Sequence, residues 1–290
     1  MNIVVCIKQV PDSTHIRVHP VTNTIMRQGV PAIINPYDLF AIEEALRLKD
    51  QFGGKVTVLT MGPPQAEPAL RKAMSYGCDE AVLVTDKVFA GADTLATSYV
   101  LACAIRTLDA ESPVDLVFTG KQTIDGDTAQ VGPGIAKRLE MELLTYVSRI
   151  VSVDRQARRI RVERRAEGGV QVLETRLPAL ITMLEGSNEI RFGSAPDMFR
   201  AARAEIRVWD RNAAGIDDIK KVGLKGSPTI VSRVFGPTPR AEKAKQIPFD
   251  PQTPEAAAQA LLEQVLAEVP KVKKELDGRK NAATEGASHE

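Results

Sequence analysis

The sequence predicts an α/β fold: a doubly wound, mostly parallel sheet with an antiparallel extension and a C-terminal arm and helix. Short apolar runs at 2–8, 55–60, 81–85 and 114–118 alternate with helical patterns. Such alternation places helices on both faces of a parallel sheet. From Val147 onwards the runs instead alternate polar and apolar residues, which is typical of an antiparallel meander with one solvated face.

The composition excludes several classes of protein. Lys and Arg number 38 against 37 Asp and Glu, so a net charge of +1 gives no indication of a nucleic-acid partner. No apolar run approaches the roughly 20 residues that cross a bilayer. The three cysteines form no CxxC pair, and the three histidines have no partner at ligand spacing. We therefore expect a reduced, cytoplasmic protein that has no signal peptide, is not membrane-spanning and holds no metal.

The N-terminal elements follow in order. Residues 2–8 are predicted to form a buried strand, and the loop after it carries no GxGxxG turn. Residues 15–30 indicate a small hairpin. A helix is expected over 38–52, with Asp38 as its N-cap and a pair of glycines at its end.

A second helix start is rich in hydroxyl groups. After the strands at 55–60 and 81–85, Asp93 opens a helix whose first turns carry Thr94, Thr97 and Ser98. One interpretation is a capped helix start with close packing. The other is an oxygen-rich helix start that faces a phosphate.

The stretch from Gly120 to Pro133 is the strongest candidate for a binding site. It follows the strand at 114–118, turns at Gly126, and precedes a helix over 134–139. Free N–H groups at such a helix start bind anions, and Asp127 or Thr128 is a candidate cap. An ordinary strand-to-helix connection is the alternative. The carboxyl ends of parallel strands share one edge, so the turns after residues 8, 60, 85 and 118 are expected to line one cleft.

The C-terminal third is predicted in three parts. Strands at 147–153, 158–164, 170–175 and 177–183 precede an exposed loop over 184–190. The arginines of the meander indicate a solvated face, with a docking surface as the alternative.

Past Phe199 the strand pattern is lost, and residues 213–253 show no core-forming period. A helix that begins at Pro254 has an apolar stripe, which we expect to dock on another chain. We therefore predict an α/β domain over 1–212 and an arm with a helix over 213–290. The tail is expected to be disordered from about residue 279.

Four blocks of sequence together resemble the β subunit of electron transfer flavoproteins along nearly the whole chain. They occur in the same order and at the same spacing as in that family. The blocks are Val4 to Pro11, Ile34 to Asp38, Met61 to Pro63, and Gly120 to Asp127.

The resemblance implies a heterodimer with an α subunit that holds the electron-transferring FAD. In ordinary members the β subunit holds AMP. In electron-bifurcating members it holds a second FAD, takes electrons from NADH, and passes them to the α-subunit FAD and to a low-potential acceptor such as ferredoxin or flavodoxin. The implied fold is the family's adenine-nucleotide-binding sheet, with a C-terminal arm that wraps the α subunit.

The stretches 92–98 and 127–133 are similar to those of FAD-binding, NADH-linked β subunits. Physically, their small residues would leave room for a flavin, and their hydroxyl groups could donate hydrogen bonds to a diphosphate. The bifurcating type is therefore expected, and the AMP-binding carrier is the alternative. The chain would be an electron-transfer subunit without a catalytic side chain, and an NADH-oxidising flavoprotein if it bifurcates. By motif position, the residues that border the adenosine are Cys6, Lys8, Asn35, Asp38 and Met61. Those that face the flavin or diphosphate are Asp93, Thr94, Thr97, Asp127, Thr128, Gln130 and Val131, and Gly120 and Gln122 complete the cofactor-binding set.

A further partner, a dehydrogenase or a quinone oxidoreductase, is implied by the family's recognition loop. The corresponding stretch is 184–191, where Ser187 takes the place of an exposed Leu. A small polar residue is a poor contact residue, which disfavours an acyl-CoA dehydrogenase unless Leu184 or Ile190 serves instead. A nucleotide-binding regulatory protein that acts alone is a third interpretation, and the apolar stripe after Pro254 argues against it.

Overall fold

The computed structural model describes residues 1–12, 17–18, 25–26, 31–231 and 246–275. By its contacts the chain forms two compact units, Met1–Gly236 and Pro237–Glu290. The first unit contains a nine-stranded sheet and every residue predicted to bind a cofactor.

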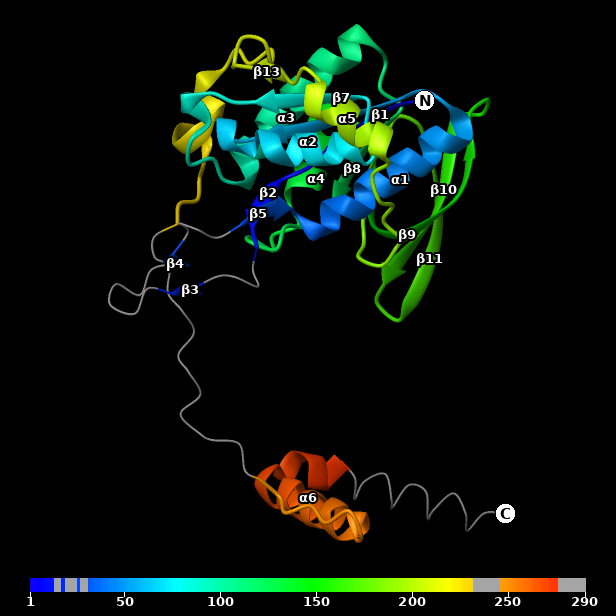
Figure 1. Ribbon diagram of the computed structural model, residues 1–290, viewed down its shortest axis with the longest axis vertical. Helices are drawn as coiled ribbons and strands as arrows, with labels where there is room; N and C mark the ends of the chain where they lie inside the picture. The colour runs from blue at the N-terminus through cyan, green and yellow to red at the C-terminus, as the bar shows by residue number, and fades with distance from the viewer. Residues whose placement is uncertain (13–16, 19–24, 27–30, 232–245, 276–290) are drawn as a thin grey trace. The chain divides into compact units, whose positions relative to one another are not determined.

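The sheet has the strand order β11-β10-β9-β12-β8-β1-β6-β7-β13 (Figure 1). From β12 to β13 all neighbours pair in parallel, and β9 pairs in parallel with β12 but antiparallel with β10. The predicted mostly parallel sheet with an antiparallel extension is therefore confirmed. The strands are β1 (Asn2–Cys6), β6 (Lys55–Met61), β7 (Glu80–Val84), β8 (Leu116–Gly120), β9 (Glu142–Asp154), β10 (Arg159–Ala166), β11 (Gly169–Arg176), β12 (Ala179–Met183) and β13 (Arg207–Trp209).

The sheet separates two hydrophobic cores. Successive residues of the central strand β1 point to opposite faces, so Ile3 and Val5 enter one core while Val4 and Cys6 enter the other. Because both faces are covered, the central parallel strands consist mainly of buried apolar residues. The first core is covered by α1 (Pro36–Phe52), α2 (Glu67–Ser75) and α5 (Ala195–Arg203), and the second by α3 (Thr94–Glu111) and α4 (Val131–Leu139) (Figure 1).

The chain after α5 contributes more to this unit than the sequence predicted. Strand β13 extends the sheet by pairing with β7, with Arg207 opposite Val82. Ala214, Ile216 and Val222 are buried in the core beneath α3. The expected loss of strand structure past Phe199 is therefore wrong, and residues within 213–253 do contribute to the core. By its contacts, the first compact unit extends to Gly236, past the boundary predicted at 212. Three residues are too few for a strand period to be visible in the sequence.

Short elements complete the first unit. Strand β2 (Gln9–Pro11) pairs antiparallel with β5 (Ala32–Ile34), and β3 (Arg17–Val18) pairs antiparallel with β4 (Ile25–Met26). The second pair confirms a hairpin within 15–30, although its turn lies outside the described residues. Single turns of 3-10 helix are η2 (Pro64–Ala66), η3 (Lys87–Phe89), η4 (Ile219–Lys221) and η5 (Gly223–Gly226).

The second unit contains α6 (Pro254–Glu268), the helix predicted to begin at Pro254. Its apolar side chains are exposed in this chain, including Leu261 at 54% and Leu262 at 49%. Among the described residues, no helix combines the length and the apolarity that a bilayer span requires. The tail predicted to be disordered begins beyond residue 275 and lies outside the described residues.

Candidate functional site

The carboxyl ends of β8, β1, β6 and β7 lie along one edge of the sheet, as the sequence predicted. The chain winds outward from β1 through β6 to β7 and then returns to place β8 on the other side of β1. The helices that follow these two halves cover opposite faces. Open α/β sheets bind their ligands at such a switch point, here between the ends of β1 and β8.

Asp38 connects the two loops at this switch point. Its carboxylate accepts hydrogen bonds from the backbone N–H of Lys8, which follows β1, at 2.7 Å and of Gly120, which ends β8, at 3.1 Å. Gly120 is required here, because a Cβ would lie 2.4 Å from Asp38 Oδ1. Burial raises the pKa of Asp38 to about 7, against the hydrogen bonds from Asn35, Lys8 and Gly120, which favour the ionised form.

The prediction that Asp38 caps its helix is wrong. Helix α1 begins at Pro36, so Asn35 takes the cap position and Asp38 lies in the first turn. Asn35 is fully buried, and its amide donates to Gln122 O at 2.8 Å while its oxygen accepts from Ile124 N at 3.1 Å. Asn35 and Asp38 therefore hold the loops around the site through their polar atoms.

The other residues predicted near the adenosine differ in exposure. Lys8 is exposed and forms an ion pair with Asp125 at 2.7 Å across the switch point. Met61 ends β6 half-buried against the core beneath α3. Cys6 lies in that core; its burial, and next the charge of Asp38, raise the pKa of its thiol, so it stays protonated.

The start of α3 is capped by the side chain of Asp93, its N-cap residue. The Asp93 Oδ1 atom accepts from the N–H groups of Leu95 at 2.9 Å and Ala96 at 3.0 Å. The next residue, Thr94, donates its hydroxyl to the side-chain oxygen of Gln130, at the start of α4, at 2.7 Å. The two hydroxyl-rich helix starts that the sequence indicated therefore lie together.

The start of α4 has no side-chain cap. Gln130 occupies the cap position without a capping hydrogen bond, so the predicted caps Asp127 and Thr128 are both wrong. Instead, Asp127 accepts from the Gln122 amide at 2.7 Å, and Thr128 is exposed. Asp127 and Ala129 have φ of 52° and 55°, a left-handed conformation that costs free energy and is frequent at binding loops. The first N–H groups of α4 are thus available to an anion.

Five of the predicted residues form two hydrogen-bonded groups along the edge. One runs from Asn35 through Gln122 to Asp127, and the other joins Thr94 to Gln130. The hydroxyls of Thr97 and Thr128 hydrogen-bond to no other described residue. Val131 packs against the core beneath α3, as Met61 does.

Sequence reasoning missed two contributions to this edge. Lys121, directly after Gly120, lies over the rings of Tyr37 at 5.3 Å and Tyr146 at 5.8 Å. Thr229 donates to Asp93 although the two residues are far apart in sequence. Lys121 lies within a recognised block, Gly120 to Asp127, and could have been suspected, but no local signal points to Thr229.

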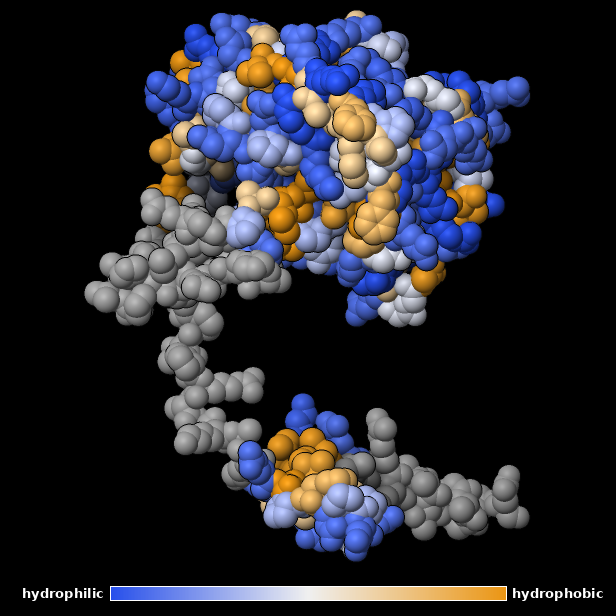
Figure 2. Space-filling model, in the orientation of Figure 1, coloured by the Kyte–Doolittle hydropathy of each residue, from blue (hydrophilic) through white to orange (hydrophobic). Residues whose placement is uncertain are grey.

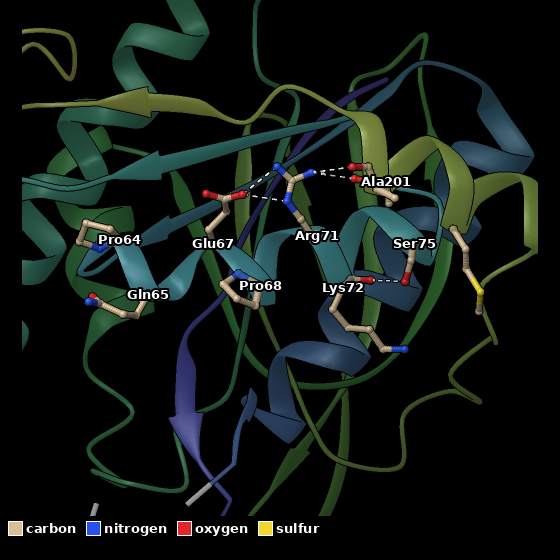
Figure 3. Close-up of a pocket in the computed structure, with 10 residues that line it drawn as sticks. Pro64, Gln65, Glu67, Pro68, Arg71, Lys72, Ser75 and Ala201 are labelled. Atoms are coloured by element: carbon tan, nitrogen blue, oxygen red, sulfur yellow. Dashed lines mark hydrogen bonds and ion pairs between the residues drawn. The ribbon is translucent and has the colours of Figure 1, made fainter. Parts of the chain in front are cut away.

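A separate groove of about 800 Å³ lies between α2 and α5 (Figure 3). Arg71 crosses it, paired with Glu67 at 2.7 Å and donating to the carbonyl oxygens of Ala201 and Ala204. None of the predicted cofactor residues lines it. Among the residues that the structure describes, no cluster of His, Cys, Asp and Glu is arranged to hold a metal ion.

Known proteins match this chain over most of its length. The family model described as electron transfer flavoprotein domain matches residues 22–214. Protein FixA of Azotobacter vinelandii is 66% identical over 96% of this chain and 99% of its own. Protein FixA of Bradyrhizobium diazoefficiens is 61% identical over 99% of each chain. The electron transfer flavoprotein subunit beta of Clostridium acetobutylicum is 49% identical over 80% of this chain and 87% of its own.

The chain therefore belongs to the electron transfer flavoprotein family. Because its relatives include a beta subunit matched over most of both chains, the resemblance to β subunits is confirmed, and with it a role in electron transfer.

Proposed function

We propose that this chain is the FAD-holding β subunit of an electron-bifurcating electron transfer flavoprotein and accepts electrons from NADH. The observation that carries the proposal is the uncapped start of α4, joined to the start of α3 through Thr94 and Gln130. A β subunit implies an α subunit as partner, which would hold the electron-transferring FAD. A carrier that holds AMP here is the alternative.

The residues at this edge fit a nucleotide diphosphate. The free N–H groups of α4 and the uncommitted hydroxyls of Thr97 and Thr128 are donors suited to phosphate oxygens. Gly126 is exposed, and the nearest atom to a Cβ built there is Thr123 Oγ1 at 3.5 Å, so a ligand can approach this turn. Bound FAD would supply the redox chemistry, while this chain binds and orients it.

Asn35 and Asp38 would act indirectly. Their polar atoms are engaged with the loops after β1 and β8, so they fix the backbone that borders the adenosine. The small residue Ala92, which precedes α3 and is half-buried, would leave space for the ring system of a flavin, which AMP would not need.

The nucleotide content of the co-purified αβ complex tests the proposal. The complex is denatured, and FAD and AMP are separated and quantified. Two FAD per heterodimer, together with NADH oxidation, is the expected result. One FAD and one AMP would contradict it and support the AMP carrier, and two FAD without reaction with NADH would contradict the NADH linkage.

The apolar stripe of α6 is the proposed contact with the α subunit. Leu261, Leu262, Val265 and Val269 are all more than a third exposed in this chain. An amphipathic helix gains its stability by burying such a stripe.

Ferredoxin or flavodoxin would serve as the low-potential acceptor.

The loop expected to meet a dehydrogenase or quinone oxidoreductase is arranged differently from the prediction. Leu184 is fully buried, and the Ser187 hydroxyl is buried without a described partner, so neither is an exposed contact. Phe192, one residue past the predicted stretch, is 95% exposed. Figure 2 shows hydrophobic surface over α5 and the segment before it. Phe192 takes the place of Leu184 or Ile190 as the proposed contact residue.

Phe192 is held from both sides. Arg191 pairs with the buried Glu43 at 2.9 Å and with Asp50 at 2.8 Å. Gly193 lies so close to Ser75 that a Cβ would be 2.1 Å from its carbonyl oxygen. An exposed aromatic ring on a fixed backbone loses little conformational freedom on binding, as contact residues of high energy do.

Phe192→Ala should weaken binding of the heterodimer to its dehydrogenase or quinone oxidoreductase about tenfold or more, with no change in unfolding midpoint. The affinities can be compared by surface plasmon resonance. Val170→Ala, an apolar change at an exposed position (64%) on the edge strand β11, is the matched control. Equal affinities of Phe192→Ala and the unchanged protein would contradict the assignment.

A further inference from the structure

Asp93 divides its carboxylate between two segments of the chain. Oδ1 caps α3, whereas Oδ2 accepts the backbone N–H of Thr229 at 3.1 Å and its hydroxyl at 2.8 Å. Asp93 was predicted to face a flavin or diphosphate, but all of these bonds lie within the protein. Its carboxylate therefore joins the start of α3 to a segment that follows the sheet.

The segment 222–229 lies against the turn that precedes α3. Ser227 accepts the Asp93 N–H at 2.8 Å and donates its hydroxyl to Gly223 O at 2.7 Å. Gly223 has φ of 55°, and a Cβ there would be 2.1 Å from Val88 O. The Leu224 side chain lies against Gly91, where a Cβ would meet it at 2.6 Å. The segment is thus fixed by backbone contacts that larger residues would not permit.

Thr229 is the last attachment of this segment that the structure describes. Ile230 and Val231, which follow, are 73% and 83% exposed. Among the described residues of the first unit, no hydrogen bond joins a residue after Thr229 to another. The unit itself ends at Gly236, so the contact between Thr229 and Asp93 holds the chain close to the point where it leaves this unit.

The turn at Asp93 and Thr94 also borders the edge of the sheet where the nucleotide is proposed to bind. Thr94, next to Asp93, donates to Gln130 at the uncapped start of α4. Any ligand that orders the first turn of α3 also orders the backbone that positions the Asp93 carboxylate. The hydrogen bonds that Thr229 donates to the Asp93 carboxylate order the same turn.

We propose that Asp93 is a positioning residue that couples nucleotide binding at this edge to the anchoring of residues 222–229. The inference rests on the proposed nucleotide at the starts of α3 and α4. Because such coupling is reciprocal, the nucleotide strengthens the anchor by the same factor by which the anchor strengthens nucleotide binding.

Asp93→Asn separates the two roles of the carboxylate. The amide oxygen can still cap α3, since Asn is as good a cap as Asp. The amide nitrogen cannot accept the two hydrogen bonds from Thr229. Thr229→Val removes only the hydroxyl contact and should have a smaller effect. Asp86→Asn is the matched control, because Asp86 caps η3 with its Oδ1 and makes no described bond to 222–229.

The experiment measures hydrogen–deuterium exchange of the peptide 225–231 in the αβ complex, stripped of nucleotide and then reloaded with FAD or with AMP. Nucleotide should slow exchange at Thr229 about fivefold or more in the unchanged protein and in Asp86→Asn. Asp93→Asn should lose this slowing while still binding nucleotide, with an affinity lower by the same factor. A purely structural role would instead raise exchange equally with and without nucleotide.

Two results would overturn the coupling. One is nucleotide binding without any change in exchange at 225–231, and the other is equal slowing in Asp93→Asn and the unchanged protein. Failure of FAD and AMP alike to bind the unchanged complex would overturn the proposed function together with the coupling. Nucleotide titration of the unchanged complex therefore distinguishes failure of the proposed function from failure of the coupling alone.

Discussion

The beginnings of α1 and α4 border the same edge of the sheet but differ in the burial and pairing of their polar side chains. At α1, Asn35 and Asp38 are 0% and 4% exposed and are paired with backbone groups of two loops. At α4, Asp127 and Thr128 are exposed, and no side chain caps the helix. Buried polar groups must be paired within the protein, whereas exposed ones remain available to a ligand. The polar side chains at the start of α1 thus hold the loops of the site in place, and the start of α4 is where we expect a ligand to bind.

The largest effect should come from Asp38→Ala. The change leaves the buried N–H of Gly120 and the part-buried N–H of Lys8 without a partner, which should lower the free energy of unfolding by about 3 kcal/mol. Urea denaturation measures the difference. Asp127→Ala, the same change at the exposed helix start, should stay within about 0.5 kcal/mol. If both variants lose equal stability, the distinction between the two regions is wrong.

The pH dependence of stability should also differ between the regions. Burial raises the pKa of Asp38 to about 7 from an ordinary 3.8. The folded state therefore binds more protons than the unfolded state between these values, so this group contributes stability below pH 3.8 that is lost as the pH rises to 7. Relative to Asp38→Asn, the unchanged protein should lose about 2 kcal/mol of unfolding free energy between pH 5 and pH 8. Parallel pH profiles for the two proteins would contradict this.

The smallest effect on stability should come from Gln130→Ala. The substitution removes the acceptor of the Thr94 hydroxyl at the exposed helix start, and should change unfolding by no more than about 0.5 kcal/mol. Because it loosens the contact between α3 and α4 at the binding edge, nucleotide affinity should fall about fivefold, as measured by fluorescence titration of FAD. Gln171→Ala, on the exposed strand β11, should alter neither property. A loss of stability without loss of affinity would place Gln130 among the structural residues.

The parallel sheet could be predicted because its strands are buried on both faces and therefore form continuous apolar runs. The run predicted at 55–60 corresponds to β6 (Lys55–Met61), and that at 114–118 to β8 (Leu116–Gly120). The convergence of the turns followed from the parallel direction of these strands. The resemblance adds a prediction of which residues in these turns would bind a cofactor.

The roles of individual side chains could not be predicted, because they depend on contacts between distant residues. The sequence predicted Asp38 as a helix cap, whereas its carboxylate accepts hydrogen bonds from the N–H groups of Lys8 and Gly120. Asp93 looked free for a ligand, but Thr229 occupies one of its oxygens. Ser187 looked exposed because polar loop residues usually are, yet its hydroxyl is buried.

The position of β1 at the centre of the sheet has a consequence for the order of folding. β1 pairs with β6 on one side and with β8 on the other, where Ile3 lies opposite Leu116. During synthesis at about 5–20 residues per second, the first strand would wait roughly 6–20 seconds for its second neighbour to leave the ribosome. Pairing between segments so distant in sequence also slows folding after release. The apolar first strand is thus a part of the nascent chain that we expect a chaperone to protect.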